Sequence, residues 1–474
     1  MAHMIINGRQ IELDGEKNVL GVIRKAGIDL PTFCYYPELA PYGACRMCLV
    51  ENERGGMIAA CSEVPFDGMV VKTNTEKLKK HRKLMLELLL GSHCHDCLTC
   101  PKSEKCQLQE LAVRVGVDKI RFQNTREPQP VDDSSHVLEI DRVKCVLCGN
   151  CIRICEELQN VGAVNFAKRG SEMYVSTAFD KPLNETYCTG CGQCSVYCPT
   201  GAITVKDESD KLWQAIYDDG LKTVALFDPS IASTIGAEFG LSAGEDALGK
   251  LVSALRRIGF DEVYDLSKAA DAAGTAEVSA FLDRFDEKGK LPWFTSWCPA
   301  WRKYVHDRHP DLKDYLSPND VPAQAISAAV NAREIDAAGS LFVTAIGPCT
   351  ALKHESTADL ALTALELVQI IKGMGLAYDR IAPEEPMALS GAEGGAGGDI
   401  DATRLSEAVT RAAGDRGVRA VTVYGLANAE EIVRQVKAGD VRYDFIDVLA
   451  CPHGCETGAG HPRASVKQRI QTEI

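Results

Sequence analysis

The sequence predicts a multidomain protein of mixed class, α+β over its first 215 residues and α/β over the remainder. Three observations predict it. The chain has 474 residues, enough for two to four domains and at least one large core. Sixteen of its 20 cysteines precede residue 200. From about residue 216, short apolar runs alternate with helical patterns, which is typical of a parallel α/β sheet.

The composition limits the class of protein. Hydrophobic residues make up 45% of the chain and charged residues 25%, as in an ordinary globular protein. No apolar run reaches about 18 residues, so no membrane span is expected. The N-terminal stretch MAHMIINGRQIELDGEKNVL has no apolar core of a signal peptide. A net charge of −14 argues against binding to nucleic acid. We therefore expect a soluble, cytoplasmic protein.

The cysteines fall into sets, which favours metal ligation over disulfides in a chain that nothing directs outward. The sets are Cys34, Cys45, Cys48 and Cys61; Cys94, Cys97, Cys100 and Cys106; Cys145, Cys148, Cys151 and Cys155; Cys188, Cys191, Cys194 and Cys198; and, after a gap of about a hundred residues, Cys298, Cys349, Cys451 and Cys455.

The first 78 residues begin with a predicted hairpin, because the Asn7-Gly8 pair separates two alternating runs. A helix is expected at 18–28. The first set of four cysteines follows, with Cys61 expected on a later strand. The plant-type spacing for a [2Fe–2S] cluster is C-x4-C-x2-C, whereas the first gap here is ten residues. This longer form resembles the ferredoxin-like β-grasp domain at the front of NADH dehydrogenase and [FeFe]-hydrogenase subunits, which implies one [2Fe–2S] cluster on these cysteines.

Residues 79–120 predict a second centre. The stretch GSHCHDCLTCPKSEKC has spacings of x2 and x5 between Cys97, Cys100 and Cys106. Three thiolates are too few for a four-iron cluster, and the segment offers His93, Cys94 and His95 as the fourth ligand. It resembles the one-histidine, three-cysteine [4Fe–4S] site of hydrogenases and NADH dehydrogenases, written H-x3-C-x2-C-x5-C. That resemblance selects His93 and leaves Cys94 without a role. A neutral imidazole in place of a thiolate tends to raise a cluster's potential.

Residues 121–215 contain the pair CVLCGNCIRIC and CTGCGQCSVYCP. Each reads C-x2-C-x2-C-x3-C, the bacterial ferredoxin run in which the fourth cysteine ligates the other cluster and is expected to open a short helix. Zinc knuckles are the alternative, disfavoured by the doubled run. The predicted [4Fe–4S] ligands are Cys145, Cys148, Cys151 and Cys198 for one cluster, and Cys188, Cys191, Cys194 and Cys155 for the other.

From residue 216, buried strands are expected at 222–231, 291–297, 340–349, 419–426 and 443–451, with helices such as 247–259 and 428–439 between them. Cys298, Cys349 and Cys451 stand at or just past strand ends, and Cys455 follows four residues on. Open α/β sheets bind ligands at the carboxyl ends of their strands, so these cysteines can meet. Plain buried thiols are the alternative, since free cysteine is often buried. A fifth cluster is expected.

The motifs TSWCPAW (295–301), GPCTALKHE (347–355) and LACPHGCETGAGHP (449–462) carry a further resemblance. They are similar to TSCCPxW, MPCxxKxxE and MACxxGCxxGGGxP, the three H-cluster motifs of the [FeFe]-hydrogenase family. The whole chain resembles a multi-cluster large subunit of the kind found in NAD(P)-linked, electron-bifurcating complexes. The resemblance implies a hydrogenase H-domain over 216–474. It also implies that Cys298, Cys349, Cys451 and Cys455 hold the H-cluster cube, with Cys455 bridging to a diiron subsite.

The sequence departs from the family around that diiron subsite. Trp297 stands in place of the proton-shuttling cysteine, and an indole N–H cannot pass a proton as a thiol does. Ala280 replaces the next relay member, a glutamate, for which Glu277 one turn away is a substitute. Leu352 replaces the lysine that holds a cyanide of the diiron unit, and Lys353 is displaced by one position.

Two pocket methionines of the family are also replaced, by Gly347 and Leu449, and GAEGGAGGDIDATRL (391–405) stands where the family has GGVMEAALR. Because every cube thiolate is kept while the pocket changes, we expect the cube to be retained and the diiron subsite to be altered or absent. No catalytic residue is assigned. The alternative is an active or sensory [FeFe] hydrogenase with a non-standard proton route.

The function expected from the resemblance is electron transfer, through one [2Fe–2S] and four [4Fe–4S] clusters. The chain has no G-x-G-x-x-G fingerprint after a strand and no P-loop, so NAD or flavin is expected on a partner chain. Expected partners are flavin/NAD(P)-binding iron–sulfur subunits, ferredoxin, and a catalytic subunit such as a formate dehydrogenase. The domains are expected at 1–78, 79–120, 121–215 and 216–474.

Overall fold

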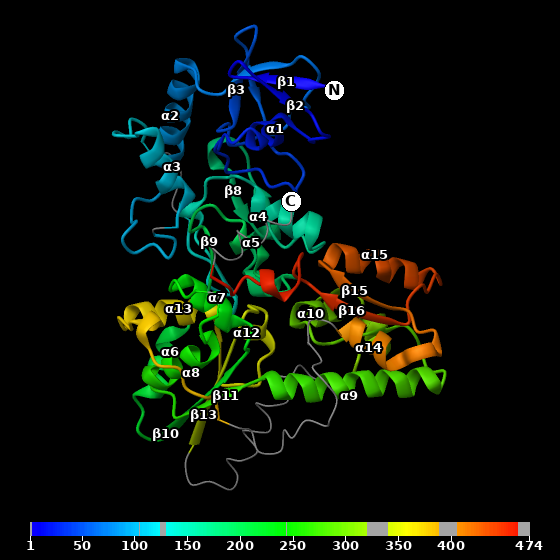
Figure 1. Ribbon diagram of the computed structural model, residues 1–474. Coiled ribbons are helices and arrows are strands. Elements are labelled where there is room, and N and C mark those ends of the chain that lie inside the picture. Colours follow the sequence, from blue (N-terminus) through cyan, green and yellow to red (C-terminus); the bar gives the residue numbers. More distant parts are fainter. Residues whose placement is uncertain are drawn as a thin grey trace.

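The computed structural model describes residues 2–103, 105–123, 129–242, 244–319, 340–387 and 405–462. Figure 1 shows the N-terminal domain at one end of an elongated molecule, the cysteine-rich segments in the middle, and two α/β halves at the other end. Among the described residues, no helix combines the length and the apolar character needed to cross a membrane.

The N-terminal domain is a five-stranded sheet of order β2-β1-β5-β3-β4. The bounds are β1 (His3–Ile6), β2 (Arg9–Glu12), β3 (Leu49–Asn52), β4 (Met57–Ala59) and β5 (Val70–Lys72), with helix α1 (Val19–Lys25). The predicted hairpin is confirmed, since Asn7 and Gly8 both have positive φ, 52° and 81°. Cys61 lies in a turn two residues past β4, not on a strand as expected.

Two helices follow, α2 (Glu76–Gly91) and α3 (Gln107–Val115), and the cysteine-rich loop joins them. Arg82 on α2 is buried and donates hydrogen bonds to the carbonyls of Met47, Leu49 and Thr73. Because a buried guanidinium must have its donors satisfied, these bonds fix α2 against the N-terminal sheet. The loop therefore starts from a rigid base.

The segment that contains the cysteine runs 145–155 and 188–198, called the ferredoxin-like segment below, has short elements. They are β6 (Leu138–Ile140) paired with β9 (Ile203–Val205), β7 (Asn165–Ala167) paired with β8 (Tyr174–Ser176), helix α4 (Asn150–Arg153) continued by a π-helical turn (Ile154–Leu158), and helix α5 (Gln193–Val196). Short 3-10 segments elsewhere are Arg142–Lys144, Gly170–Glu172, Ala178–Asp180, Leu183–Glu185, Pro310–Tyr315, Tyr378–Arg380, Gly414–Arg416 and Cys455–Thr457.

The C-terminal region contains the five predicted strands, but they form two parallel sheets instead of one. The first has the order β11-β10-β13-β14, with β10 (Leu221–Phe227), β11 (Glu262–Asp265), β13 (Ser340–Gly347) and β14 (Leu360–Thr363). The second has the order β12-β16-β15, with β12 (Trp293–Phe294), β15 (Ala420–Tyr424) and β16 (Phe445–Leu449).

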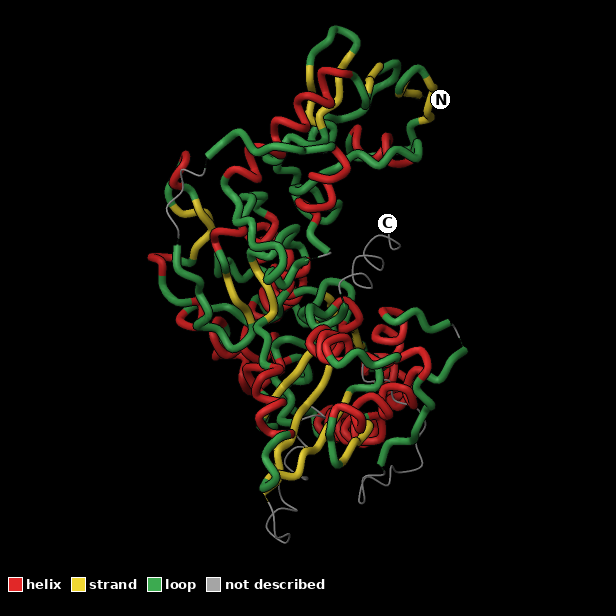
Figure 2. The backbone as a smooth tube through the Cα atoms, turned by 90° about the vertical axis from the view of Figure 1, so that its left-hand side faces the viewer, coloured by secondary structure: helices red, strands yellow, loops and turns green. Residues whose placement is uncertain are grey.

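Each sheet has helices of its own, and this is why they stay separate. The first half contains α6 (Ser209–Ile216), α7 (Ile231–Glu238), α8 (Ala247–Ile258) and α13 (Ala364–Gly373), and the second α9 (Ser267–Asp286), α10 (Pro299–Arg308), α14 (Leu405–Ala413) and α15 (Leu426–Lys437). Helix α12 (Leu352–Glu355) is short. Apolar side chains on α8 and α13 share a core with β10 and β13, whereas those on α9 and α14 share another with β12 and β16. Figure 2 shows the two halves from the side.

Candidate metal centres

The first set of cysteines converges beneath the loop that follows α1. All four are buried, and the backbone N–H of Cys45 donates to the Cys34 sulfur at 3.4 Å. The thiols of Cys48 and Cys61 are hydrogen-bonded to each other, and Cys61 also lies in the field of Cys34 and Cys45. The Cys34 thiol lowers the pKa of Cys45 to about 6. A set of close thiols with N–H donors suits an iron–sulfur cluster, which is held by thiolates.

The second set lies in the loop between α2 and α3. Cys106 lies in the field of Cys100 and Cys97, and Cys94 lies in that of Cys100 as well. His93 is buried, its Nδ1 has no hydrogen-bond partner among the described residues, and burial lowers its pKa to about 4. A neutral imidazole is the form that binds metal, so this histidine suits a ligand role.

The two ferredoxin-type runs exchange their fourth cysteines. One pocket is lined by Cys145, Cys148, Cys151 and Cys198, so the last cysteine of the second run joins three from the first. In the other group, the pKa of Cys194 is raised first by burial and then by the charges of Cys191, Cys188 and Cys155. The structure thus brings together the two predicted sets.

The helices of these runs differ from the expectation. Cys151 and Cys194 lie inside α4 and α5, Cys155 lies in the π-helical turn, and Cys198 follows α5, so no fourth cysteine opens a helix. The cause is the glycine before each helix. Gly149 and Gly192 adopt φ of 71° and 68°, which turns the chain into the helix directly after the second cysteine of each run.

The fifth set forms where the two C-terminal sheets meet. Cys298 and Cys451 come just after β12 and β16 of the second sheet, and Cys349 comes just after β13 of the first. Burial raises the pKa of Cys455, and the charges of Cys298 and Cys349 raise it further, so the remaining thiol is close to the others. The rule for open α/β sheets places ligands at the carboxyl ends of the strands of one sheet. Here the carboxyl ends of strands from two sheets supply the site together.

Tight backbone packing holds the third motif against the second. A Cβ on Gly458 or on Gly460 would lie 2.6 Å from the carbonyl oxygen of Pro348. Gly460 also donates its N–H to that carbonyl at 3.0 Å. Only glycine permits this approach, and it places Cys455 beside Cys349. In Figure 1 the C-terminal segment, in red, crosses the junction between the two halves.

The fourth and fifth sets are joined directly. Thr350 donates its hydroxyl to the Gly190 carbonyl at 2.9 Å, and the side-chain amide of Gln193 donates to the Thr457 carbonyl at 3.1 Å. The charge of Cys191 is among the causes that raise the pKa of Cys451. The two sites therefore lie next to each other.

The first and third sets are joined in the same way. Asn150 donates its side-chain amide to the Phe33 carbonyl at 2.8 Å, and Arg153 donates to the Cys34 carbonyl at 2.8 Å. Burial raises the pKa of Tyr36, and the charges of Cys148 and Cys198 raise it further. The first, third, fourth and fifth sets thus form a connected series from the N-terminal domain to the two-sheet junction.

The residues at the predicted diiron position fill space with apolar groups. The Trp297 ring packs into the core with Phe281 and Phe445, and its N–H has no partner among the described residues. Leu352 Cδ1 lies 3.6 Å from where a Cβ on Gly347 would stand, so Leu352 covers the surface that Gly347 leaves bare. Leu449 is buried at the end of β16. Segment 388–404, which contains most of the divergent 391–405 stretch, lies outside the described residues.

One residue of this site was not anticipated. Asp228, directly after β10, has its Cβ 3.7 Å from the Cβ position of Gly347, and its charge contributes to the raised pKa of both Cys349 and Cys455. The predicted strand at 222–231 contains Asp228, whereas the observed strand ends at Phe227, so the strand-end rule would have pointed to this residue only with the shorter strand. A carboxylate here adds negative charge beside Cys349 and Cys455.

Lys353 does not point toward the thiols. Its ammonium is buried and bonds to the Lys206 carbonyl at 2.9 Å, to Glu366 at 2.7 Å and to Glu208 at 3.2 Å. The one-position displacement therefore gives this lysine a different partner set. It ties the end of the ferredoxin-like segment to helix α13.

Glu277 is fully buried and accepts three hydrogen bonds, from Trp293 Nε1 at 2.7 Å, Ser317 Oγ at 2.7 Å and Asn319 Nδ2 at 2.6 Å. Near it, Asp447 accepts from Thr295 Oγ1 at 2.8 Å, while its second oxygen has no partner among the described residues. Burial raises the pKa of Asp447 to about 7, and Glu277 contributes to the rise.

The pKa of Asp447 leads to a pH-dependent stability. In the unfolded chain the pKa of Asp447 returns to its ordinary value of 3.8. The stability that Asp447 contributes to the folded chain therefore falls as the pH rises from 3.8 to about 7. An Asp447→Asn variant should therefore gain stability relative to wild type by about 2 kcal/mol between about pH 5.5 and pH 7. Thermal melts at several pH values measure this, with the exposed Asp219→Asn as the control. Parallel pH profiles for Asp447→Asn and wild type would contradict it.

Among the described residues, no group of three or more His, Cys, Asp or Glu side chains is arranged to hold a single metal ion. A structural zinc site needs four ligands at about 2.0–2.3 Å from one ion.

Four family models match this chain. Residues 221–459 match "Iron only hydrogenase large subunit, C-terminal domain". Residues 1–76 match a 2Fe-2S iron-sulfur cluster binding domain, residues 82–121 the NADH-ubiquinone oxidoreductase-G iron-sulfur binding region, and residues 181–204 a 4Fe-4S binding domain. These ranges include four of the five cysteine sets, and the set from Cys145 to Cys155 lies between two of them.

Two relatives described here match over almost the whole chain, and two other proteins match part of it. It is 32% identical to the NADP-reducing hydrogenase subunit HndD of Solidesulfovibrio fructosivorans, over 98% of this chain and 89% of that protein. Iron hydrogenase 1 of Clostridium pasteurianum is 27% identical over 100% and 91%. A subunit of the NADH-quinone oxidoreductase of Rhizobium meliloti is 36% identical over 43% of this chain and 24% of its own length. A solved apo [FeFe]-hydrogenase of Chlamydomonas reinhardtii aligns at a TM-score of 0.46 with 24% identity, over 55% of this chain and 88% of that one.

Proposed function

This chain belongs to the iron-only, or [FeFe], hydrogenase large-subunit family, and from that membership we propose that it is an iron–sulfur electron-transfer subunit whose diiron subsite is altered or absent. The observation that carries the proposal is a contrast within one site. The four thiols at the two-sheet junction are brought together, while the side chains at the expected diiron position, Leu352, Trp297 and Asp228, are apolar or anionic.

The proposed cofactors are one [2Fe–2S] and four [4Fe–4S] clusters, which supply one-electron carriers when bound. The proposed ligands are Cys34, Cys45, Cys48 and Cys61; His93, Cys97, Cys100 and Cys106; Cys145, Cys148, Cys151 and Cys198; Cys188, Cys191, Cys194 and Cys155; and Cys298, Cys349, Cys451 and Cys455. The hydrogen bonds from Asn150, Arg153, Gln193 and Thr350 hold neighbouring sites in fixed contact. The proposed domains are 1–78, 79–120, 121–215 and 216–474.

The altered pocket has a physical consequence. A diiron unit bearing cyanides is anionic, and the family holds it with a lysine. Here Leu352 offers no charge, and the ammonium of Lys353 is engaged with Glu208 and Glu366. Asp228 adds like charge, which costs free energy in a buried site. The electrostatics therefore favour a cube alone.

The proposed partners follow from the relatives. HndD is a subunit of an NADP-reducing hydrogenase, and the Rhizobium meliloti relative is a subunit of an NADH-quinone oxidoreductase. We infer that this chain exchanges electrons with an NAD(P)-binding, flavin-containing iron–sulfur subunit, and passes them to ferredoxin or to a catalytic subunit such as a formate dehydrogenase, in a complex that can bifurcate electrons.

An active hydrogenase is the second candidate, and one observation favours it. Glu277 and Ser317 are hydrogen-bonded at 2.7 Å in the interior, which is the type of contact that a proton route needs. In that case Trp297 would have to be bypassed, since an indole passes no proton.

Infrared spectroscopy separates the two candidates. The chain, matured with a synthetic diiron precursor, should contain about 18 iron ions for one two-iron and four four-iron clusters, and should show no bands of bound CO or cyanide. H2 turnover should be absent. A Leu352→Lys variant treated in the same way tests whether the missing charge is the cause. Cyanide bands in the wild-type chain would overturn the proposal and favour the hydrogenase.

The exchange of fourth cysteines can be tested by matched substitutions. Cys198→Ser should perturb the same cluster as Cys148→Ser, and Cys155→Ser the same cluster as Cys191→Ser, because each pair contributes to one set. Electron paramagnetic resonance spectra of the reduced variants measure this. If Cys198→Ser instead resembled Cys191→Ser, each run would hold its own cluster, and the proposed ligand sets would be wrong.

A further inference from the structure

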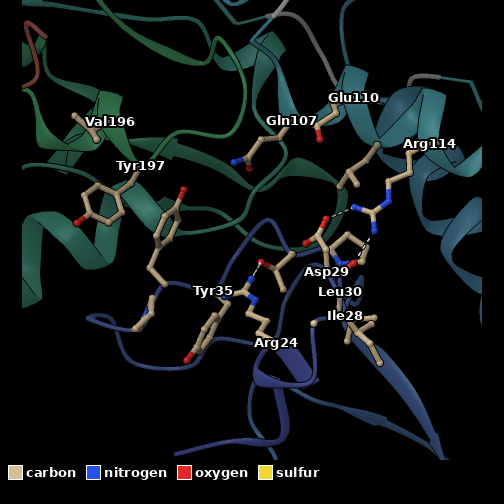
Figure 3. Close-up of a pocket in the computed structure, with 16 residues that line it drawn as sticks. Arg24, Ile28, Asp29, Leu30, Tyr35, Gln107, Glu110, Arg114, Val196 and Tyr197 are labelled. Carbon is tan, nitrogen blue, oxygen red and sulfur yellow. Dashed lines mark hydrogen bonds and ion pairs between the residues drawn. The ribbon is translucent and has the colours of Figure 1, made fainter. Parts of the chain in front are cut away.

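A pocket of about 690 Å³ lies where the first three segments of the chain meet. Its walls are the loop after α1 together with Tyr35 and Tyr36, the exposed side of α3, and the end of α5 at Val196 and Tyr197. Figure 3 shows these side chains around the space between the three elements. The volume is within the range of about 300–1,000 Å³ that small ligands occupy.

The pocket has aromatic walls. Tyr35 is covered by the guanidinium of Arg24 at 5.7 Å, and Tyr36 contacts Tyr197 edge to face, with ring centroids 4.7 Å apart. Tyrosine rings offer flat faces on which planar heterocycles stack. Tyr197 is 1% exposed and supports Tyr36 from behind, whereas Tyr35 and Tyr36 are half-buried. These two half-buried rings favour a ligand with a flat aromatic body.

The charges on the two sides of the pocket are complementary to a ligand with two polar ends. Arg114 is paired with Asp29. In the described part of the chain, by contrast, Arg24 donates only to the Thr32 hydroxyl, at 3.4 Å, and no ion pair is found for Glu110 on the opposite wall. Arg24 with Thr32 can receive an anionic group, because a guanidinium and a hydroxyl are both donors. Glu110 and Gln107 can accept from N–H groups.

We propose that this pocket binds a mononucleotide, a phosphate-bearing molecule with a flat, N–H-donating ring such as flavin mononucleotide or an adenine nucleotide. The phosphate lies at Arg24 and Thr32, the ring stacks on the tyrosines, and the ring N–H groups reach Glu110 or Gln107. No glycine-rich motif is needed, because the pocket is assembled from three segments. The binding does not depend on the proposed electron-transfer role.

The location gives the binding a consequence. Tyr35 follows Cys34 directly in the chain, and Tyr197 precedes Cys198. A ligand in this pocket therefore contacts residues next to two of the proposed cluster-binding sets. Occupancy should be visible in the spectra of those two sites.

Fluorescence titration of flavin mononucleotide with the full, cluster-loaded chain tests the proposal. Saturable quenching is expected, and Arg24→Ala should weaken binding by about tenfold or more, since a charge-assisted contact is lost. Glu110→Gln should weaken it less. The control is Arg9→Ala, an exposed arginine on β2 outside the pocket. Competition with adenosine monophosphate and with inorganic phosphate distinguishes the sources of the phosphate group.

The experiment distinguishes failure of the mononucleotide site from failure of the proposed electron-transfer function. Quenching that is absent, or equally strong in Arg24→Ala and wild type, overturns the mononucleotide site. Inorganic phosphate that competes with the same inhibition constant as adenosine monophosphate also overturns it, because the ring would then contribute nothing to affinity. Iron content and absorbance, measured on the same sample, report on the clusters, so loss of clusters with retained binding contradicts only the proposed function.

Discussion

Lys353→Met is expected to destabilise the chain by about 3–5 kcal/mol, because it removes one partner of a buried ion-pair network and leaves the others. The lysine ammonium is 1% exposed and Glu366 3% exposed. Burial alone would raise the pKa of Glu208, but Lys211 and Lys353 outweigh it and hold that pKa low. Without Lys353, two carboxylates face each other at the base of α13.

Methionine is close in volume to the aliphatic part of lysine. The decrease in the free energy of unfolding would therefore come from the lost charge and the lost hydrogen bonds, and not from a cavity. Thermal or denaturant unfolding, read by the loss of cluster absorbance, measures it. The matched control is Lys211→Met, since Lys211 also pairs with Glu208 but is exposed. That change should cost at most about 1 kcal/mol. Equal costs for the two variants would show that Lys353 is not the connection between the ferredoxin-like segment and α13.

The same pair of variants bears on the hydrogenase alternative. If Lys353 reached the diiron position, its replacement would change infrared bands of bound cyanide and leave the unfolding midpoint close to wild type. A shift in stability without any infrared change is the result expected from the contacts described above.

Gly192→Ala is expected to cost about 2–5 kcal/mol and to weaken the junction between the fourth and fifth thiol sets. A Cβ at this position would lie 2.6 Å from both Ala459 Cβ and Thr350 Oγ1. Its φ of 68° adds about 1–2 kcal/mol for a residue with a side chain, and overpacking adds about 1–3 kcal/mol. The ferredoxin-like segment would then have to move away from the C-terminal motifs.

Gly116→Ala is the control, because Gly116 has a similar φ of 73° at the end of α3 but nothing within 4 Å of its Cβ position. It should show only the backbone cost of about 1–2 kcal/mol. The rate of electron transfer between the adjacent clusters, followed by freeze-quench resonance spectroscopy, should fall in Gly192→Ala and not in Gly116→Ala. Equal behaviour would mean that the junction tolerates the added methyl group.

Several features of the fold could be predicted because they depend on neighbours in the chain. The Asn7-Gly8 hairpin follows from the φ values that those two residues tolerate. The five C-terminal strands follow from their apolar runs. The position of Cys198 beside the first three cysteines of the other run, and of Cys155 near Cys194, agrees with the spacing of the two runs. The assignment of these cysteines as cluster ligands stays a prediction.

Other predictions failed where packing outweighed local pattern. One sheet was expected, but the helices α9 and α14 build a separate core on β12 and β16. The fourth cysteines were expected to open helices, but the left-handed glycines Gly149 and Gly192 start those helices earlier. Cys61 was expected on a strand and lies beyond its end.

By itself, the sequence determined which side chains can be ligands and how they group, because ligand spacing and turn preferences act over a few residues. Only the tertiary structure decided where Lys353 and Asp228 point, which face of each sheet is covered, and that three segments enclose a pocket under Arg24. Those features depend on contacts between different elements of the fold, such as Lys353 with Glu208 and Asp228 with Gly347. Such contacts depend on how whole elements pack.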